Sequence, residues 1–220
     1  MSTSLPQLIA VYAIPVLFAI TLHEAAHAWA SARLGDPTAR DLGRLSANPI
    51  RHIDPIGTIV VPLLILLTSK ALGGGGMLFG WAKPVPIEVA RLRRPRRDLG
   101  LVAVAGPAAN ILMALFWAAL LKLFVVLQIR QEFLLLVAQA GILVNVGLAV
   151  INLLPLPPLD GGRILAALLP YRAAIAFYRI ERFGLLIVLG LLATGVLGLI
   201  TVPVFRWGVD IISNLFKFAG

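Results

Sequence analysis

The sequence contains no cysteine, which excludes a disulfide framework and a thiol nucleophile and leaves the redox compartment undefined. Charge is also scarce, because only 13% of the 220 residues are charged while 60% are hydrophobic. Soluble domains carry about 25% charged residues, so this composition is not that of an ordinary soluble domain. Internal repeats and low-complexity linkers are absent as well, and we expect a single membrane-embedded domain over residues 1–220.

The apolar residues gather into long runs. The runs cover residues 5–32, 56–72, 99–127, 134–154 and 183–204. All but the second reach the ~20 residues that a helix needs to cross the hydrocarbon core. Beyond Val204, apolar and charged residues alternate at helical spacing, which predicts a C-terminal helix in the membrane interface. The predicted fold is an all-α polytopic membrane protein with about five apolar helical segments.

The formal net charge of +9 does not indicate a nucleic-acid partner, because the basic residues are confined to short connections. They concentrate in residues 33–51, 83–97 and 163–182. This is the positive-inside pattern of membrane proteins rather than a binding face. We therefore expect a multi-pass protein whose main partner is the lipid bilayer, with these three connections in the cytoplasm. The membrane that we expect is the cytoplasmic membrane of a prokaryote.

The run at 56–72 conflicts with a simple alternation of spans. If 33–51 and 83–97 are both cytoplasmic, the chain must enter the membrane at 56–72 and return before residue 83. The glycines at 73–76 break any helix there, and a re-entrant extended segment near 73–88 would have to border protein or a watery cavity. The alternative is that 56–72 spans once and that 33–51 is external.

The first run contains the sequence His23-Glu24-Ala25-Ala26-His27. Residues four apart share a helix face, so both imidazoles can point at one ion with Glu24 beside them, as in zinc proteases. The two histidines could instead belong to a polar network between helices. Because ionisable groups inside a span cost roughly 2.5–3.5 kcal/mol each, we favour a functional site.

A catalytic zinc site generally has three protein ligands and leaves a fourth position for water. Asp160 is a candidate for the third, since it lies at the cytoplasmic end of the 134–154 helix in the predicted topology. That helix runs parallel to the first one, so Asp160 and His27 have similar depth near the cytoplasmic face. Asp160 could also be a turn or cap residue before Gly161-Gly162.

Four motifs in this order resemble those of the site-2 protease family of intramembrane zinc metalloproteases, in its minimal form without PDZ or CBS domains. They are His23-Glu24-Ala25-Ala26-His27, Phe79-Gly80-Trp81-Ala82-Lys83-Pro84-Val85-Pro86, Ala105-Gly106-Pro107-Ala108-Ala109-Asn110, and residues 152–162 ending in Leu159-Asp160-Gly161-Gly162. The resemblance implies that His23, His27 and Asp160 hold one zinc ion per chain. It also implies that Asn152 and Asn110 border the active site, where their amides could donate to an oxyanion or form interhelical hydrogen bonds.

The resulting prediction is a metalloprotease that cleaves a peptide bond within or near a transmembrane segment, with Glu24 as general base. From the resemblance, its substrates would be anti-sigma factors, membrane-tethered regulators or signal-peptide remnants. A metal or ion transporter and a catalytically silent scaffold are the alternatives. Transport gives Glu24 no role and no inverted repeat is evident, while an intact Glu24 disfavours a silent scaffold.

The third histidine, His52, lies in a basic connection at the depth expected for the metal site. It is either an ordinary loop or cap residue, or a removable fourth ligand. A fourth protein ligand would displace the catalytic water and close the site, since four-ligand zinc sites are structural.

Overall fold

The computed structural model describes residues 5–51 and 83–218, and within these ranges the chain is helical apart from short connections and contains no strand. The helices are α1 (Leu5–Leu34), α2 (Thr38–Asp41), α4 (Pro95–Val126), α5 (Glu132–Asn152), α6 (Asp160–Leu168), α7 (Tyr171–Glu181), α8 (Gly184–Ala193) and α9 (Val196–Phe216). Short 3-10 turns lie at Pro49–Arg51 and Val89–Arg91.

Four of these helices, α1, α4, α5 and α9, are long and apolar enough to cross a membrane. The shorter ones have 21 residues, or about 31 Å at the helical rise. Large apolar side chains such as Leu112, Phe116 and Leu199 are exposed on their outer faces, where hydrocarbon would be their natural solvent. The predicted all-α polytopic membrane fold is confirmed.

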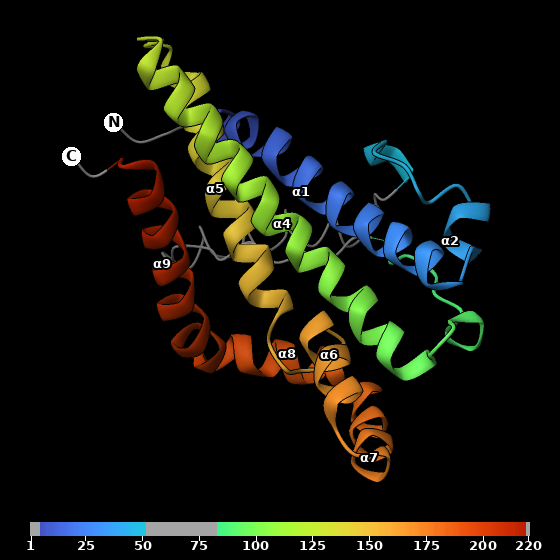
Figure 1. Ribbon diagram of the computed structural model, residues 1–220. Coiled ribbons are helices and arrows are strands. Elements are labelled where there is room, and N and C mark those ends of the chain that lie inside the picture. Colours follow the sequence, from blue (N-terminus) through green and yellow to red (C-terminus); the bar gives the residue numbers. More distant parts are fainter. Residues whose placement is uncertain (1–4, 52–82, 219–220) are drawn as a thin grey trace.

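The core lies where α1, α4 and α5 pack side by side, and α9 flanks α5 (Figure 1). Small residues allow the close approach of these helices, since Ala19, Ala114 and Ala138 are fully buried between them. At Gly141 on α5 an added Cβ would collide with the Trp117 ring on α4. Such contacts hold α1, α4 and α5 at fixed positions relative to one another.

The connections that follow α1 and precede α4 meet at the same end of the bundle. The N–H of Arg93 donates to the carbonyl of Leu34 at 3.0 Å, and the N–H of Glu88 donates to the Asp36 carboxylate at 2.7 Å. Helix α1 therefore runs toward this end, α4 runs away from it and α5 returns to it. Residues 83–88 form neither helix nor strand, whereas the run at 56–72, the rest of the segment near 73–88 and His52 lie outside the described residues.

The C-terminal third differs from the prediction in where its helices break. A span over 183–204 followed by a separate interfacial helix is wrong, because the break falls at Gly195 and one helix continues from Val196 to Phe216. Gly195 has φ of +76°, a conformation that glycine adopts at little cost. The sequence is apolar on both sides of Gly195, so hydrophobicity alone gave no sign of this break.

Candidate metal centre

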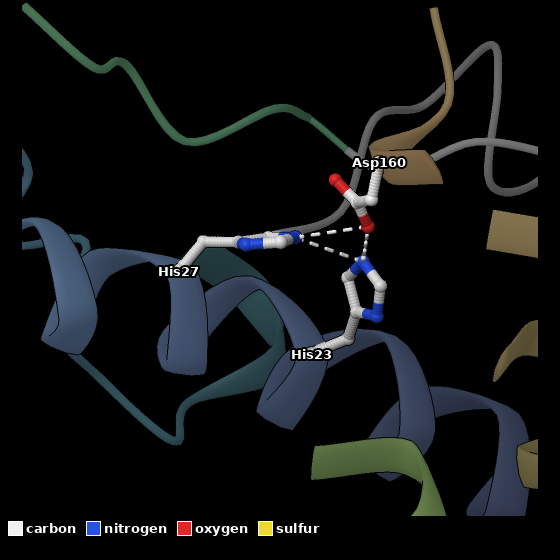
Figure 2. A group of neighbouring side chains, drawn as sticks. All are labelled: His23, His27 and Asp160. Atoms are coloured by element: carbon white, nitrogen blue, oxygen red, sulfur yellow. Dashed lines mark hydrogen bonds and ion pairs between the residues drawn. The ribbon is translucent and has the colours of Figure 1, made fainter. Parts of the chain in front are cut away.

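Three predicted site residues from two distant parts of the chain converge in the interior. His23 and His27 lie one turn apart on α1, and Asp160 is the first residue of α6. Figure 2 shows their side chains turned toward one another. Their exposed fractions are 8%, 5% and 7%, so the group is largely shielded from the surroundings.

The three inward atoms are close to equidistant. Nε2 of His23 and Nε2 of His27 lie 3.2 and 3.3 Å from Oδ2 of Asp160, and the two Nε2 atoms are 3.0 Å apart. Tetrahedral ligands at 2.0–2.1 Å from a zinc ion would be separated by about 3.3 Å. The spacing is therefore that of three donors around one small cation.

The hydrogen bonds behind each imidazole show which ring nitrogen carries the proton. Nδ1 of His27 lies 2.8 Å from the carbonyl oxygen of Val102, and Nδ1 of His23 lies 2.6 Å from Oδ1 of Asn110. Because both partners are acceptors, each Nδ1 must donate. In the neutral rings the two Nε2 atoms thus present lone pairs to the centre.

The carboxylate adds a third acceptor to these two lone pairs. Oδ2 of Asp160 is buried and receives no hydrogen bond from the described residues. Three acceptors at about 3 Å repel one another, and an unpaired buried carboxylate oxygen is costly. A cation bound among them would remove both penalties, so the donor set fits a metal ion, and two imidazoles with one carboxylate are typical of catalytic zinc sites.

Glycines on two helices allow this convergence. An added Cβ at Gly106 on α4 would collide with the imidazoles of both His23 and His27. At Gly161 and Gly162 it would collide with the backbone at Leu153–Pro157, the connection that follows α5. The contact at Gly106 lets α4 pack directly against both imidazoles. The contacts at Gly161 and Gly162 bring the start of α6 close to the end of α5, so that Asp160 reaches the histidines.

Glu24 lies next to His23 on α1 and contacts the non-helical segment that precedes α4. The N–H of Val85 donates to Oε2 of Glu24 at 3.0 Å. The Glu24 side chain is half-buried. It is thus held in place while remaining accessible, as a proton acceptor at a reaction site needs to be.

The two predicted asparagines are placed differently. Asn110 is fully buried beside His23, and both hydrogens of its amide already have acceptors, the carbonyl of Ala19 and the side chain of Asn145. Donation to an oxyanion would require one of these bonds to break. Asn152, half-buried at the end of α5, donates one hydrogen to the carbonyl of Leu148, and its second hydrogen has no acceptor among the described residues.

Sequence reasoning missed three contributors to the centre. The Val102 carbonyl is backbone and leaves no trace in the sequence. Gly106 belongs to one of the four motifs, but the sequence does not reveal that it contacts both imidazoles. Asn145 could have been found from the sequence, since it is a strongly polar residue inside an apolar span.

Comparison with known proteins gives matches over most of the chain. The profile described as Peptidase family M50 matches residues 127–195, a range that contains Asn152 and Asp160. "Putative zinc metalloprotease YwhC" of Bacillus subtilis (strain 168) is 35% identical over 212 residues, covering 93% of this chain and 90% of that protein. "Putative zinc metalloprotease Rip2" of Mycolicibacterium smegmatis is 31% identical, covering 93% of this chain and 72% of that protein. No solved structure matches the chain.

Proposed function

The chain belongs to peptidase family M50, the site-2 protease family, and from this membership we propose that it is a zinc metalloprotease that hydrolyses peptide bonds within or near transmembrane segments. The observation that carries the proposal is the convergence of His23, His27 and Asp160 as three acceptors 3.0–3.3 Å apart, with no hydrogen bond to Oδ2 of Asp160 from the described residues. A structural polar network would place a donor between such acceptors.

In this proposal, one zinc ion is held by Nε2 of His23, Nε2 of His27 and a carboxylate oxygen of Asp160. When bound, zinc supplies a Lewis acid that polarises a peptide carbonyl and acidifies water. Two neutral imidazoles and one carboxylate leave the site with a net positive charge, which supports that chemistry. The burial of the three side chains restricts access from bulk water.

Glu24 acts as the general base. Its carboxylate takes a proton from the attacking water and delivers it to the nitrogen of the leaving amine, so the base is regenerated at the end of the cycle. The N–H of Val85 holds one carboxylate oxygen. The other oxygen has no hydrogen-bond donor among the described residues and can face the substrate. Asn152, with one amide hydrogen available, is the better of the two asparagines as an oxyanion donor.

The proposed substrate is a membrane-spanning segment of another protein, such as an anti-sigma factor, a membrane-tethered regulator or a signal-peptide remnant. A helical substrate hides its carbonyls in its own hydrogen bonds and must unwind before attack. Residues 83–88 are not helical and contact Glu24 through Val85, so they offer backbone groups with which an unwound segment can pair.

The centre is proposed to lie near the cytoplasmic face of the cytoplasmic membrane, because basic connections are expected to stay in the cytoplasm. The start of α4, which carries Arg96 and Arg97, packs against α6, which begins at Asp160, so these arginines and the centre lie toward the same end of the bundle. We propose that residues 1–220 act as one domain.

The proposal predicts that Glu24→Gln keeps stoichiometric zinc and loses proteolysis by at least about 10²-fold, because Glu24 transfers protons rather than binding metal. Elemental analysis of purified protein and cleavage of a membrane-embedded reporter peptide in proteoliposomes measure the two properties. Asp160→Ala and His27→Ala should lose both. A wild-type protein that binds no zinc, or an active Asp160→Ala variant, would contradict the proposal.

A further inference from the structure

Asn145 on α5 lies two hydrogen bonds away from the metal centre, and neither family membership nor any motif described above gives it a role. We propose that Asn145 is a positioning residue, which acts through Asn110 to hold His23 in the tautomer and orientation that a zinc ligand requires. This inference rests on the proposed function, because it takes His23 as a ligand.

The orientation of the Asn145 amide is fixed by its own helix. Asn145 is fully buried, and its Nδ2 donates to the carbonyl of Gly141 at 2.8 Å. A backbone carbonyl can only accept, so the nitrogen of the amide must face Gly141. Oδ1 of Asn145 is then turned toward α4, where it accepts a hydrogen bond from Nδ2 of Asn110 at 3.0 Å.

The amide of Asn110 is fixed in turn by two acceptors. Its second hydrogen goes to the carbonyl of Ala19 on α1 at 3.2 Å. A rotation of the amide by 180° would place its oxygen against the oxygens of Ala19 and Asn145, where all three repel. Oδ1 of Asn110 is therefore held toward His23, with its lone pairs 2.6 Å from Nδ1.

Because Oδ1 of Asn110 can only accept, neutral His23 can satisfy it in one tautomer only. Nδ1 carries the hydrogen, and Nε2 presents its lone pair to Asp160 and His27. His27 receives the same constraint from the Val102 carbonyl, which no side-chain substitution removes. The tautomer of His23, in contrast, depends on a series of hydrogen-bonded side chains that starts at Asn145 on α5 and reaches His23 on α1 through α4. These three helices pack side by side in Figure 1.

The interior of the bundle strengthens this dependence. Where no water can replace the lost partner, leaving a buried amide group without its hydrogen bond costs about 1–3 kcal/mol. Both asparagine side chains therefore resist reorientation. Partners that orient a ligating histidine typically change metal affinity by about 10–100-fold when they are removed. The effect expected of Asn145 is smaller than that of Asn110, because Asn110 keeps its bond to Ala19 when Asn145 is replaced.

The test compares four variants of the full chain in detergent. Asn110→Leu and Asn145→Leu remove hydrogen bonding at similar volume. Asn145→Asp in its neutral form, which burial favours, restores one acceptor and one donor. Thr201→Val is the matched control, because Thr201 is also buried and donates within α9 to Leu197, and no hydrogen bond among the described residues joins it to the centre.

Zinc dissociation constants are measured by competition with a chelator. We expect weakening by about 100-fold in Asn110→Leu and about 10-fold in Asn145→Leu, and values within about twofold of the wild type in Asn145→Asp and Thr201→Val. Equal affinity in Asn145→Leu and the wild type would overturn the inference, as would equal weakening in Asn145→Leu and Asn145→Asp. A wild type that binds no zinc would instead refute the proposed function.

A second readout needs no metal. In zinc-free protein labelled with ¹⁵N-histidine at pH 8, nitrogen chemical shifts distinguish protonated from bare ring nitrogens, and the His27 ring is the internal reference. We expect the hydrogen of His23 on Nδ1 in the wild type and in Asn145→Asp, and partly on Nε2 in Asn145→Leu and Asn110→Leu. Unchanged His23 shifts in both leucine variants would show that the two asparagines only join helices, which overturns the inference.

Discussion

In the candidate metal centre, Nδ1 of each imidazole faces one hydrogen-bond acceptor, and both rings lie against Gly106. The acceptors, Val102 and Asn110, decide which nitrogen faces inward, and Gly106 leaves room for both rings. Single atoms at these positions thus control whether three ligands can meet.

At the residue scale, Gly106→Ala should weaken zinc binding by at least about tenfold, because the added methyl group displaces both imidazoles from their common centre. Chelator competition measures the affinity. Gly190→Ala is the matched control, since a Cβ at Gly190 on α8 meets nothing within 4 Å, and replacing a helical glycine by alanine favours the helix by about 1 kcal/mol. Similar zinc affinity in the two variants would contradict the role given to Gly106.

The non-helical segment before α4 is the element that connects the centre to the end of the bundle. Val85 donates to Glu24 and Arg93 donates to the carbonyl of Leu34, both on α1, while Glu88 donates to Asp36 in the turn that follows α1. A change in this segment should therefore reach the proposed general base without touching the metal ligands.

At this scale, Val85→Pro should reduce kcat by about tenfold or more while zinc stays bound, because proline removes the N–H that holds the Glu24 carboxylate. Val85→Ala keeps that N–H and should retain most of the activity. Reporter cleavage and zinc content are measured together on both variants. If Val85→Pro cleaves as fast as Val85→Ala, the hydrogen bond to Glu24 has no part in catalysis.

Asp36 should make the attachment of this segment sensitive to acid. Burial raises the pKa of the Asp36 carboxyl, but hydrogen bonds from the Thr38 hydroxyl, the Thr38 N–H and the Glu88 N–H outweigh it and lower the pKa below its usual value. The unfolded chain then binds the proton more readily, so this contribution to stability is complete above about pH 4 and is lost as the pH falls through the folded-state pKa.

Replacing Asp36 by asparagine should cost about 1–3 kcal/mol at neutral pH, because the amide NH2 would face one of the N–H donors, that of Thr38 or that of Glu88, and this hydrogen bond would be lost. Thermal melting in detergent between pH 3 and pH 7 tests this. The difference in Tm between wild type and Asp36→Asn should shrink as the pH drops below 4. A difference that is constant with pH would mean that the charge of Asp36 does not stabilise the fold.

For the whole molecule, the arrangement of α1, α4 and α5 places the metal centre close to one end of the bundle. Helix α4 has 32 residues, about 48 Å at the helical rise, so the connection between α4 and α5 lies at the opposite end. The basic connections 33–51 and 83–97 share the first end, which is the proposed cytoplasmic side.

Because the chain has no cysteine, single cysteines can report this orientation without background. Cysteine at Arg40 and at Arg94 should react with a membrane-impermeant maleimide from the cytoplasmic side only. Cysteine at Gln131, in the exposed connection between α4 and α5, should react from the other side. Labelling of the Arg40 and Arg94 positions from opposite sides would contradict the shared end.

The sequence by itself determined the properties that follow from solvent and from local spacing. Apolar runs of about 20 residues predict membrane-spanning helices, and a histidine pair four residues apart lies on one helix face in any helix. The same local reasoning failed at Gly195, where residues on both sides are apolar and only a single backbone angle ends the helix.

Tertiary structure decided which distant groups meet. The pairing of His23 with Asn110, the Val102 carbonyl behind His27 and the link from Asn145 each join residues on different helices, and nothing in local spacing fixes how helices are rotated against one another. That rotation depends on close packing at residues such as Gly106, Gly141 and Ala19. The type of chemistry could thus be predicted from short motifs on α1 and around Asp160, whereas the hydrogen bonds that orient the proposed ligands depend on the packing of three helices.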